Sequence, residues 1–334
     1  MENSNLCSGR VFCITGGSGF IGRNLARYLL NIGHKVVALD NFENSTRKDI
    51  DEFLDHKNYN FIFCDITKDL EKLKDAIAFS DCVIHLAASV GVQNATNNPA
   101  SMLHSNLIGS LNVLNICAKF RKLVLVSSSS EVYGWSPKKP FREHCELVVP
   151  QPSNTRFSYA LSKIVEEFYG IGLIKESNLP FIAFRLFNSI GPGQNNNHGL
   201  VVPNLIDQAL KGEPLTVYGD GNQTRCFCDV METVDAIYRL TLCPEFIGQT
   251  YNIGNNKPTK IFELARMIKD ISGANSKLVL QPYDLIFSDG FTDMHERIPD
   301  ITKIKEAIEW EPVIELLDIL TRIIDYERSV RQKK

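Results

Sequence analysis

The stretch TGGSGFIG, residues 15–22, decides the fold of this chain. It follows an apolar run at residues 11–15, which predicts a strand, and it opens a helical period at residues 22–32. A glycine-rich turn in that context lets the backbone approach a pyrophosphate and points the helix N-terminal amides at it. Two registers fit, one starting at Gly16 and one at Gly17, each continuing through Gly19 and Gly22. The cofactor contacts expected here are Gly16, Gly19, Phe20, Ile21 and Gly22.

The rest of the first half repeats this alternation of strand and helix. Apolar runs rich in Val, Ile and Phe lie at residues 35–39, 61–64, 82–86, 123–126 and 181–186. Such near-continuous apolarity is typical of strands buried on both faces of a parallel sheet. Helical periods such as 102–119 separate the strands. The sequence therefore predicts an α/β fold with a Rossmann-type, doubly wound parallel sheet.

The second half is less regular and predicts a smaller, mixed α/β lobe. Helices are expected near residues 202–211, 261–272, 301–308 and 314–331, and a strand at 215–218. We expect residues 1–187 to bind the dinucleotide and residues 188–334 to bind substrate. Part of 224–256 is expected to return to the first domain.

Composition excludes several classes of function. A net charge of -3 over 334 residues gives no reason to expect nucleic acid or an anionic membrane as partner. The nine cysteines are odd in number and scattered, which favours a reducing compartment over a disulfide framework. No cysteine or histidine spacing predicts a metal site. The polar start lacks the apolar stretch of a signal peptide, so a cytoplasmic protein is expected.

Polar and small residues follow the predicted strands, where a cofactor would cross the sheet edge. Asp40 ends the second strand, followed by Asn41, and its carboxylate suits both ribose hydroxyls while repelling a 2′-phosphate. This favours NAD over NADP. Asp65 and Ile66 can flank adenine, although a plain turn aspartate is also consistent with the sequence. The small residues after the fourth strand leave room for the cofactor: Leu86, Ala87 and Ala88.

Tyr159 and Lys163, within SYALSK at residues 158–163, are four residues apart and share one face of a helix. An ammonium beside a phenol favours the phenolate, and an oxidised nicotinamide would add to the effect. The tyrosine would then accept a proton from a substrate hydroxyl while hydride leaves the same carbon. On its own the pair is weak evidence, because this spacing is more often typical of an aromatic ring packed on a lysine stem.

The run SSSSEVYG at residues 127–134 ends the fifth strand and brings hydroxyls to the same crevice. A serine there can hydrogen-bond the reacting oxygen beside Tyr159, although serines also commonly form turns. Asn106, early in the helical stretch 102–119 that follows the fourth strand, is a candidate to support this network from a second layer of residues.

These motifs, followed by RLFNSIGP at 185–192, TVYGDGNQTRCF at 216–227 and ERIPDITK at 296–303, resemble the extended short-chain dehydrogenase/reductases along essentially the whole chain. More narrowly, the chain resembles the NAD-dependent nucleotide-sugar epimerases, dehydratases and decarboxylases. The resemblance implies NAD in the first lobe, a nucleoside diphosphate in the second and the sugar between them. It implies Tyr159 as base, Lys163 at the nicotinamide ribose and Ser129 at the C4 oxygen. It also implies Asn188, Arg225 and Arg297 around the diphosphate and Tyr218 near the base. The full set of implied substrate contacts is Ser129, Ser130, Asn188, Val202, Tyr218, Arg225 and Arg297.

The resemblance leaves the reaction open among three outcomes that begin with oxidation at C4. Ser130–Glu131 before the motif tyrosine counts against the deoxythymidine-linked 4,6-dehydratases and resembles both the uronate decarboxylases and the GDP-mannose dehydratases. Arg297, before x-Pro-Asp, also resembles the decarboxylase pattern, whereas the segment SVGV at 89–92 looks more like an epimerase. We expect UDP-glucuronate decarboxylation, with Glu131 and Arg297 assisting at the sugar, and UDP-hexose 4-epimerisation as the alternative. A homodimer is expected, because helical stretches 102–119 and 158–174 are apolar on more than one face. A sensor of NAD or nucleotide sugar without turnover is the non-enzymatic alternative.

Overall fold

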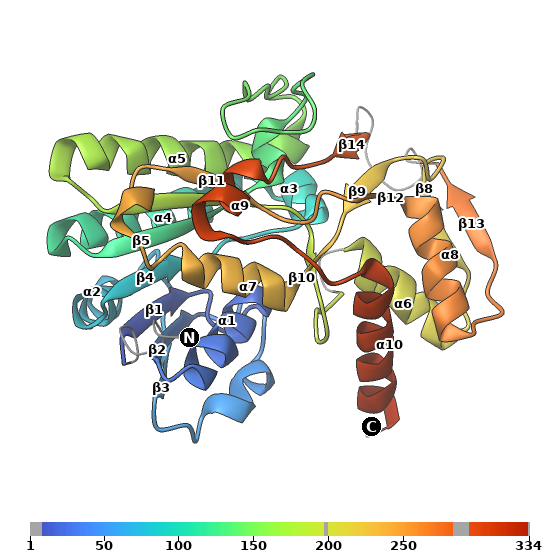
Figure 1. The fold of residues 1–334 in the computed structure, drawn as a ribbon, viewed down its shortest axis with the longest axis horizontal. Helices are drawn as coiled ribbons and strands as arrows, with labels where there is room; N and C mark the ends of the chain where they lie inside the picture. The colour runs from blue at the N-terminus through green and yellow to red at the C-terminus, as the bar shows by residue number, and fades with distance from the viewer. Residues whose placement is uncertain (1–8, 197–199, 283–293, 333–334) are drawn as a thin grey trace.

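A seven-stranded parallel sheet forms the centre of the first lobe (Figure 1). The computed structural model describes residues 9–196, 200–282 and 294–332. The strands run in the spatial order β11-β6-β5-β4-β1-β2-β3. Their bounds are β1 Val11–Thr15, β2 Lys35–Asp40, β3 Tyr59–Phe63, β4 Cys82–His85, β5 Leu123–Ser129, β6 Phe181–Leu186 and β11 Thr250–Ile253. The strand order reverses between β1 and β4, so a crevice opens at the carboxyl ends of these strands.

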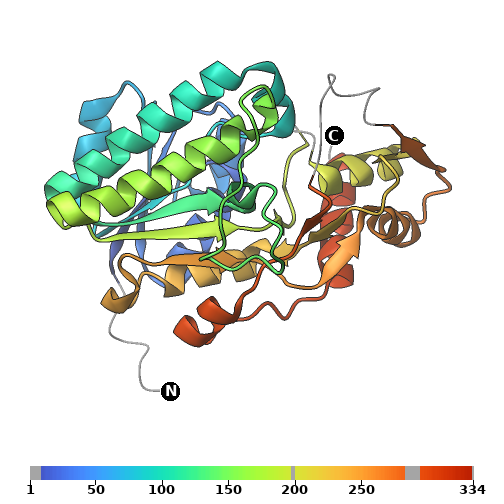
Figure 2. The ribbon, with the colours of Figure 1, turned by 90° about the horizontal axis from the view of Figure 1, so that it is seen from above.

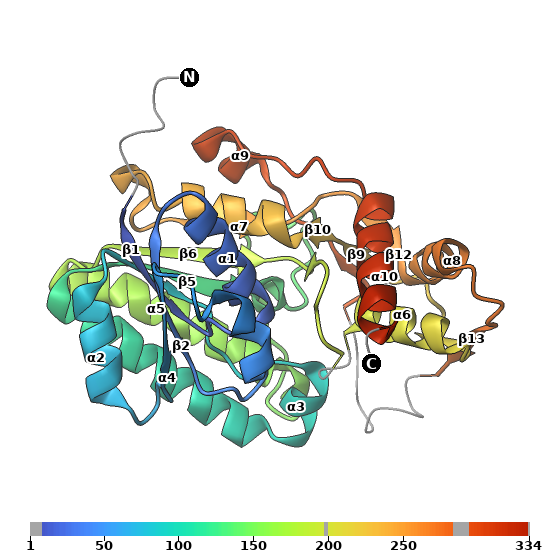
Figure 3. The same cartoon turned by 90° about the horizontal axis from the view of Figure 1, so that it is seen from below.

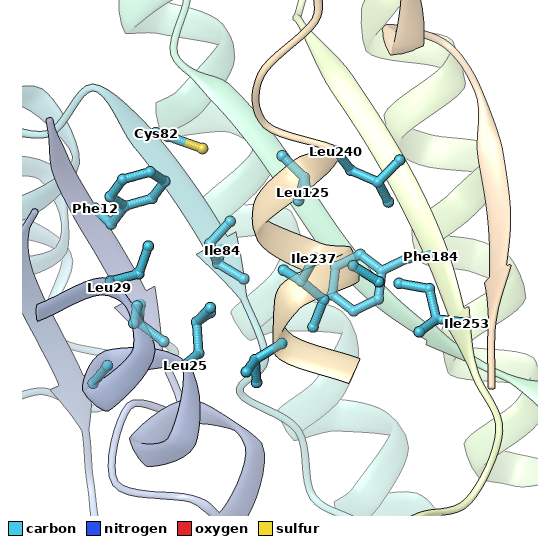
Figure 4. Packing of buried hydrophobic residues seen from close by; sticks show 14 of the residues in the cluster. Phe12, Leu25, Leu29, Cys82, Ile84, Leu125, Phe184, Ile237, Leu240 and Ile253 are labelled. Atoms are coloured by element: carbon cyan, nitrogen blue, oxygen red, sulfur yellow. The ribbon is translucent and has the colours of Figure 1, made fainter. Parts of the chain in front are cut away.

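Alternating side chains of each strand enter two separate cores, one on each face of the sheet. On one face, Phe12 and Ile14 of β1 pack with α1 (Phe20–Asn31) and α7 (Val230–Arg239). Figure 3 shows these two helices together on that side, and Figure 4 shows Leu25, Leu29 and Ile237 packed over the strands. On the other face, Cys13 packs with α2 (Leu70–Phe79), α4 (Pro99–Phe120) and α5 (Ser158–Ser177). Burial on both faces explains the near-continuous apolarity of the strand sequences.

The second lobe encloses its own apolar core. Its helices are α6 Val201–Lys211, α8 Ile261–Ser272 and α10 Leu316–Gln332. Around them lie three small sheets: β8 (Leu215–Tyr218) with β13 (Leu278–Gln281); β12 (Pro258–Lys260), β9 (Thr224–Cys226) and β14 (Glu296–Arg297); and β7 (Ser189–Ile190) with β10 (Cys228–Asp229). Apolar faces of the three helices meet in this core, which includes Leu205, Leu264 and Leu320.

The chain crosses between the lobes more than once. After β9 and β10 it returns to the first lobe, where α7 packs on α1 and β11 pairs in parallel with β6. Helix α9 (Thr302–Ile308) then lies beside β11 before α10 completes the second lobe. We propose that the lobes divide after Phe187, with the returning segment counted in the first.

Most of the expected elements are present, and several have the expected bounds. The sequence pattern predicted neither α2 nor α7, and β11 was not expected as a seventh strand of the sheet. No helix in the described ranges combines the length and the apolarity required to span a membrane.

Candidate active site

The glycine turn between β1 and α1 is shaped by close backbone contacts. Gly16 has a φ of +73°, and a Cβ there would lie 2.8 Å from the amide nitrogen of Ala87. Its own amide donates to the Leu39 carbonyl at 2.8 Å, which fixes the turn beneath β2. Within the described chain, no side chain caps the first turn of α1 and no acidic residue occupies it. The N-terminal amides are therefore available to an anion, so the turn fits the pyrophosphate of a dinucleotide.

A cavity of about 660 Å³ extends from this turn along the carboxyl ends of the strands. All of the expected cofactor contacts except Lys163 line it: Gly16, Gly19, Phe20, Ile21, Gly22, Asp40, Asn41, Asp65, Ile66, Leu86, Ala87, Ala88, Asn106 and Tyr159. Lys163 is fully buried beneath this lining. The sheet edge thus collects residues from six separate stretches of sequence into one site.

The Asp40 carboxylate is held by backbone amides at the end of β2. Oδ2 accepts from the Ser18 amide at 3.1 Å, and Oδ1 accepts from the Phe42 amide at 2.8 Å. These bonds fix the carboxylate at the wall of the cavity, where ribose hydroxyls can also donate to it. A fixed negative charge at this position disfavours a 2′-phosphate.

Asn106 clamps the loop that follows β4. Its side chain accepts from the Ser89 amide at 2.7 Å and donates to the Ser89 carbonyl at 3.1 Å and to Ser162 Oγ at 3.2 Å. It therefore ties the loop to α5 while also lining the cavity. Asp65 accepts from the amide and the hydroxyl of Thr67, so its carboxylate also stabilises a local turn.

Tyr159 and Lys163 lie on the first turns of α5, with the Lys163 Nζ atom 6.0 Å from the centre of the tyrosine ring. Burial raises the pKa of Tyr159, and Lys163 and Ser129 oppose that shift. We expected the ammonium to dominate, but Glu166 and Glu131 add to the effect of burial, so the pKa is raised overall. The tyrosine therefore keeps its proton in the protein alone.

Glu131 lies next to this tyrosine site and binds two arginines. It follows β5 in a 3-10 turn, Ser130–Tyr133, and its own backbone amide donates to the Ser129 hydroxyl at 3.2 Å, which caps the turn. Arg297 donates to its carboxylate at 2.5 Å from β14, and Arg156 donates at 3.1 Å. All three side chains are largely buried, which strengthens these charge-assisted hydrogen bonds. This cluster joins the second lobe to the carboxyl end of the first-lobe sheet.

The expected substrate contacts divide into three groups. Ser129 and Asn188 line the cavity. Arg225 and Arg297 are register partners on β9 and β14 and are nearly buried, while Tyr218 ends β8 and is half-buried. Ser130 and Val202 are buried and do not line the cavity, and Val202 belongs to the second-lobe core.

Sequence reasoning missed two charged residues of the site. Arg156 lies three residues before Tyr159, in the short turn that leads into α5. Glu166 lies one helical turn after Lys163 and pairs with it. The i,i+3 spacing predicts the second contact, whereas nothing local predicts that Arg156 reaches Glu131.

The fold and the cavity at its sheet edge define a dinucleotide-binding enzyme of the Rossmann type. Residues 12–254 match the model of the NAD dependent epimerase/dehydratase family. The chain belongs to this family and is NAD-dependent.

Curated relatives are similar over almost the whole chain. A UDP-N-acetyl-alpha-D-glucosaminuronate decarboxylase of Bacillus cytotoxicus is 34% identical over 95% of this chain and 97% of its own length. The UDP-glucuronic acid decarboxylase 1 of Xenopus tropicalis is 34% identical over 95% of this chain and 72% of its own. Among solved structures, a UDP-glucuronic acid 4-epimerase from Bacillus cereus, in complex with UDP-glucuronic acid and NAD, aligns with a TM-score of 0.86 at 25% identity. That alignment covers 96% of this chain and 99% of the other.

Proposed function

We propose that this chain is a UDP-uronate decarboxylase that acts on UDP-glucuronate through transient oxidation at C4. The observation that carries the proposal is the ion pair of Arg297 and Glu131 beside Tyr159. A uronate differs from a hexose by one carboxylate, and a guanidinium is the side chain best suited to bind it in a bidentate way. The two curated relatives described above, both decarboxylases of UDP-linked uronates by name, support the same reaction.

The chain's own residues account for the proton transfers. Tyr159 accepts the C4 hydroxyl proton, Ser129 hydrogen-bonds the C4 oxygen, and Lys163 stabilises the developing phenolate. When bound, NAD supplies the hydride acceptor for C4 and returns the same hydride later. The fixed carboxylate of Asp40 orients the cofactor at its ribose.

Oxidation at C4 makes the sugar a β-keto acid. The C5–carboxyl bond then breaks, carbon dioxide leaves, and the bonding pair remains on C5, delocalised onto the C4 oxygen. The Ser129 and Tyr159 hydroxyls hydrogen-bond that oxyanion, and electrostatic stabilisation of this kind is usually a large part of catalysis. C5 would take a proton from solvent, and on reduction of the C4 ketone Tyr159 would return its proton to the C4 oxygen, which completes the neutral pentose.

UDP-N-acetylglucosaminuronate is a second candidate substrate, because the relative from Bacillus cytotoxicus is matched over nearly its whole length. UDP-hexose 4-epimerisation remains the alternative reaction. The two uronates would be supplied with a labelled carboxyl carbon, and the UDP-hexose without label. Released carbon dioxide and the sugar product would be measured in the same reaction. Release of label with a UDP-pentose supports decarboxylation of UDP-glucuronate. A C4-inverted product with no released label would show that the chain is an epimerase.

We also propose that the protein acts in the cytoplasm as a homodimer formed through α4 and α5. These helices lie side by side on the outside of the first lobe (Figure 2). They expose Ile108, Leu161, Val165 and Phe168, the last of them 73% exposed. Large apolar side chains gathered on adjacent helices favour burial against a second copy.

A further inference from the structure

Glu166 is a buried carboxylate beside the proposed catalytic pair, and the reaction described above gives it no task. Its Oε2 accepts a hydrogen bond from Lys163 Nζ at 2.9 Å, and the two side chains are 2% and 1% exposed. Within the described ranges, Glu166 is the one hydrogen-bond partner of this ammonium. An ammonium has three donors, so Lys163 keeps donors available for a ribose.

The other charged and titratable groups around this pair have different partners or no charge. Glu167, the next residue, forms a two-point ion pair with Arg185. His85 on β4 bonds the Thr15 and Ser110 hydroxyls, and burial lowers its pKa to about 3, so its ring is neutral. Ser110 on α4 also lies against the Glu166 carboxylate, and Glu131 is turned to its arginines. Glu166 is therefore the carboxylate that balances Lys163.

This balance affects Tyr159. Burial alone would lower the pKa of Lys163, but Glu166 and Tyr159 together raise it, which keeps the ammonium charged. The same carboxylate adds to the raised pKa of Tyr159. A fully uncompensated ammonium would instead favour a permanent phenolate, which is a poor proton donor for the return step.

We propose that Glu166 is a positioning residue that holds Lys163 in place and limits the positive charge it presents to Tyr159. The tyrosine then keeps its proton in the resting protein and loses it when further positive charge enters the site. The inference rests on Tyr159 being the base of the proposed function, but it does not depend on which sugar is bound.

The test is Glu166→Gln, which keeps an oxygen acceptor for Lys163 and removes the charge. Phenolate absorbance would be titrated in the full-length protein, with and without NAD. The signal of Tyr159 is the difference from the same background carrying Tyr159→Phe. The charge removed is that of Glu166, which lies one hydrogen bond beyond Lys163 Nζ. At an effective dielectric of about 20, its removal should lower the pKa of Tyr159 by about one unit. The acid limb of kcat/KM should shift to lower pH by a similar amount.

Two further variants make the result interpretable. Glu306→Gln on α9 removes the same charge from an exposed position outside the site and should leave the titration unchanged. Glu166→Asp retains the charge but withdraws it by one methylene, so it should give a smaller shift in the same direction and serves if the Gln variant does not fold. An unshifted or raised Tyr159 pKa in a folded Glu166 variant would overturn the proposal. Because this readout needs no sugar, failure of the proposed decarboxylation is detected separately by the carbon dioxide assay.

Discussion

Arg297 donates a hydrogen bond to Glu131 at 2.5 Å, although 166 positions separate the two residues. Arg297 lies on β14 of the second lobe, and Glu131 follows β5 of the first-lobe sheet. The contact brings a cation of one lobe to the carboxyl ends of the strands of the other. A substrate that spans both lobes would meet this pair at its sugar.

Replacing Arg297 should affect the uronate more than the nucleotide. We expect Arg297→Met to lower kcat/KM for UDP-glucuronate by about 100-fold, because a charge-assisted contact near the reacting carboxylate is lost. Affinity for UDP, measured by calorimetry, should change little. Arg225→Met is the comparison: Arg225, the register partner of Arg297 on β9, is expected at the diphosphate, so UDP affinity should fall. An Arg297 variant that loses UDP affinity instead would place this arginine at the diphosphate.

Removing the Tyr159 hydroxyl should abolish most of the activity without unfolding the protein. We expect Tyr159→Phe to lower kcat by about 10²- to 10⁴-fold, the range for loss of a general base. Tyr169→Phe is the control, because it removes a hydroxyl from the same helix. That hydroxyl donates to Asn115, and neither residue lines the cavity. Carbon dioxide release and unfolding temperature are measured for both. Unimpaired turnover in the Tyr159 variant would rule out this tyrosine as the base.

Asp40 should determine the choice between NAD and NADP. Asp40→Ser removes the fixed charge at the end of β2, so NAD affinity should fall by about tenfold and discrimination against NADP should weaken. Asp65→Asn, expected near adenine, should leave the NAD to NADP affinity ratio unchanged. Titration of both cofactors into cofactor-stripped protein gives the ratio, and strong rejection of NADP by the Asp40 variant would contradict the assignment.

The buried pair of Arg185 and Glu167 should be costly to break. The guanidinium bonds both carboxylate oxygens, at 2.9 and 2.7 Å, and both side chains are nearly buried. Glu167→Gln leaves a buried cation without its counter-charge, and we expect a loss of about 3–5 kcal/mol in the free energy of unfolding. The exposed pair of Lys74 and Glu71 provides the comparison, since solvent screens it and Glu71→Gln should leave the free energy of unfolding almost unchanged. Urea denaturation measures both, and equal losses would show that burial does not set the difference.

A charge on the outer face of α5 should prevent dimer formation. Phe168→Asp places a carboxylate on the proposed interface, so sedimentation at micromolar concentration should give a monomer where the parent protein gives a dimer. Val313→Asp replaces an equally exposed apolar residue that precedes α10 and lies on neither α4 nor α5, so it should leave the dimer intact. A parent protein that sediments as a monomer would remove the basis for the proposed interface.

The sequence predicted the sheet well because each strand is buried on both faces and is therefore apolar along its length. The strand β6, Phe181–Leu186, was predicted with its observed bounds. The four-residue strand β11 was not assigned, since Thr250 and Asn252 break the apolar run. Its place in the sheet depends on pairing with β6, which no local pattern encodes.

Site residues that belong to a local motif could be predicted from the sequence, whereas contacts between residues distant in the sequence could not. The turn after β1, Asp40 and the Tyr159–Lys163 pair each lie within a short stretch whose geometry a strand or helix fixes. The two arginines that bind Glu131 come from the short turn before α5 and from β14, which are far apart in the sequence, so their contact with one carboxylate required the folded chain. The direction in which the pKa of Tyr159 shifts could not be predicted from the sequence either, because it depends on burial and on the carboxylates that surround the ring in the folded protein.

The return of the chain to β11 and α7 means that neither lobe is a separable unit. A fragment ending at Phe187 would lack α7, leaving the apolar surface of α1 open to water, and it would expose the unpaired edge of β6. Such a fragment should aggregate when expressed, and unfolding of the whole protein should occur in one cooperative step. Insertions or fusion points that separate the halves are therefore unsuitable for engineering this enzyme.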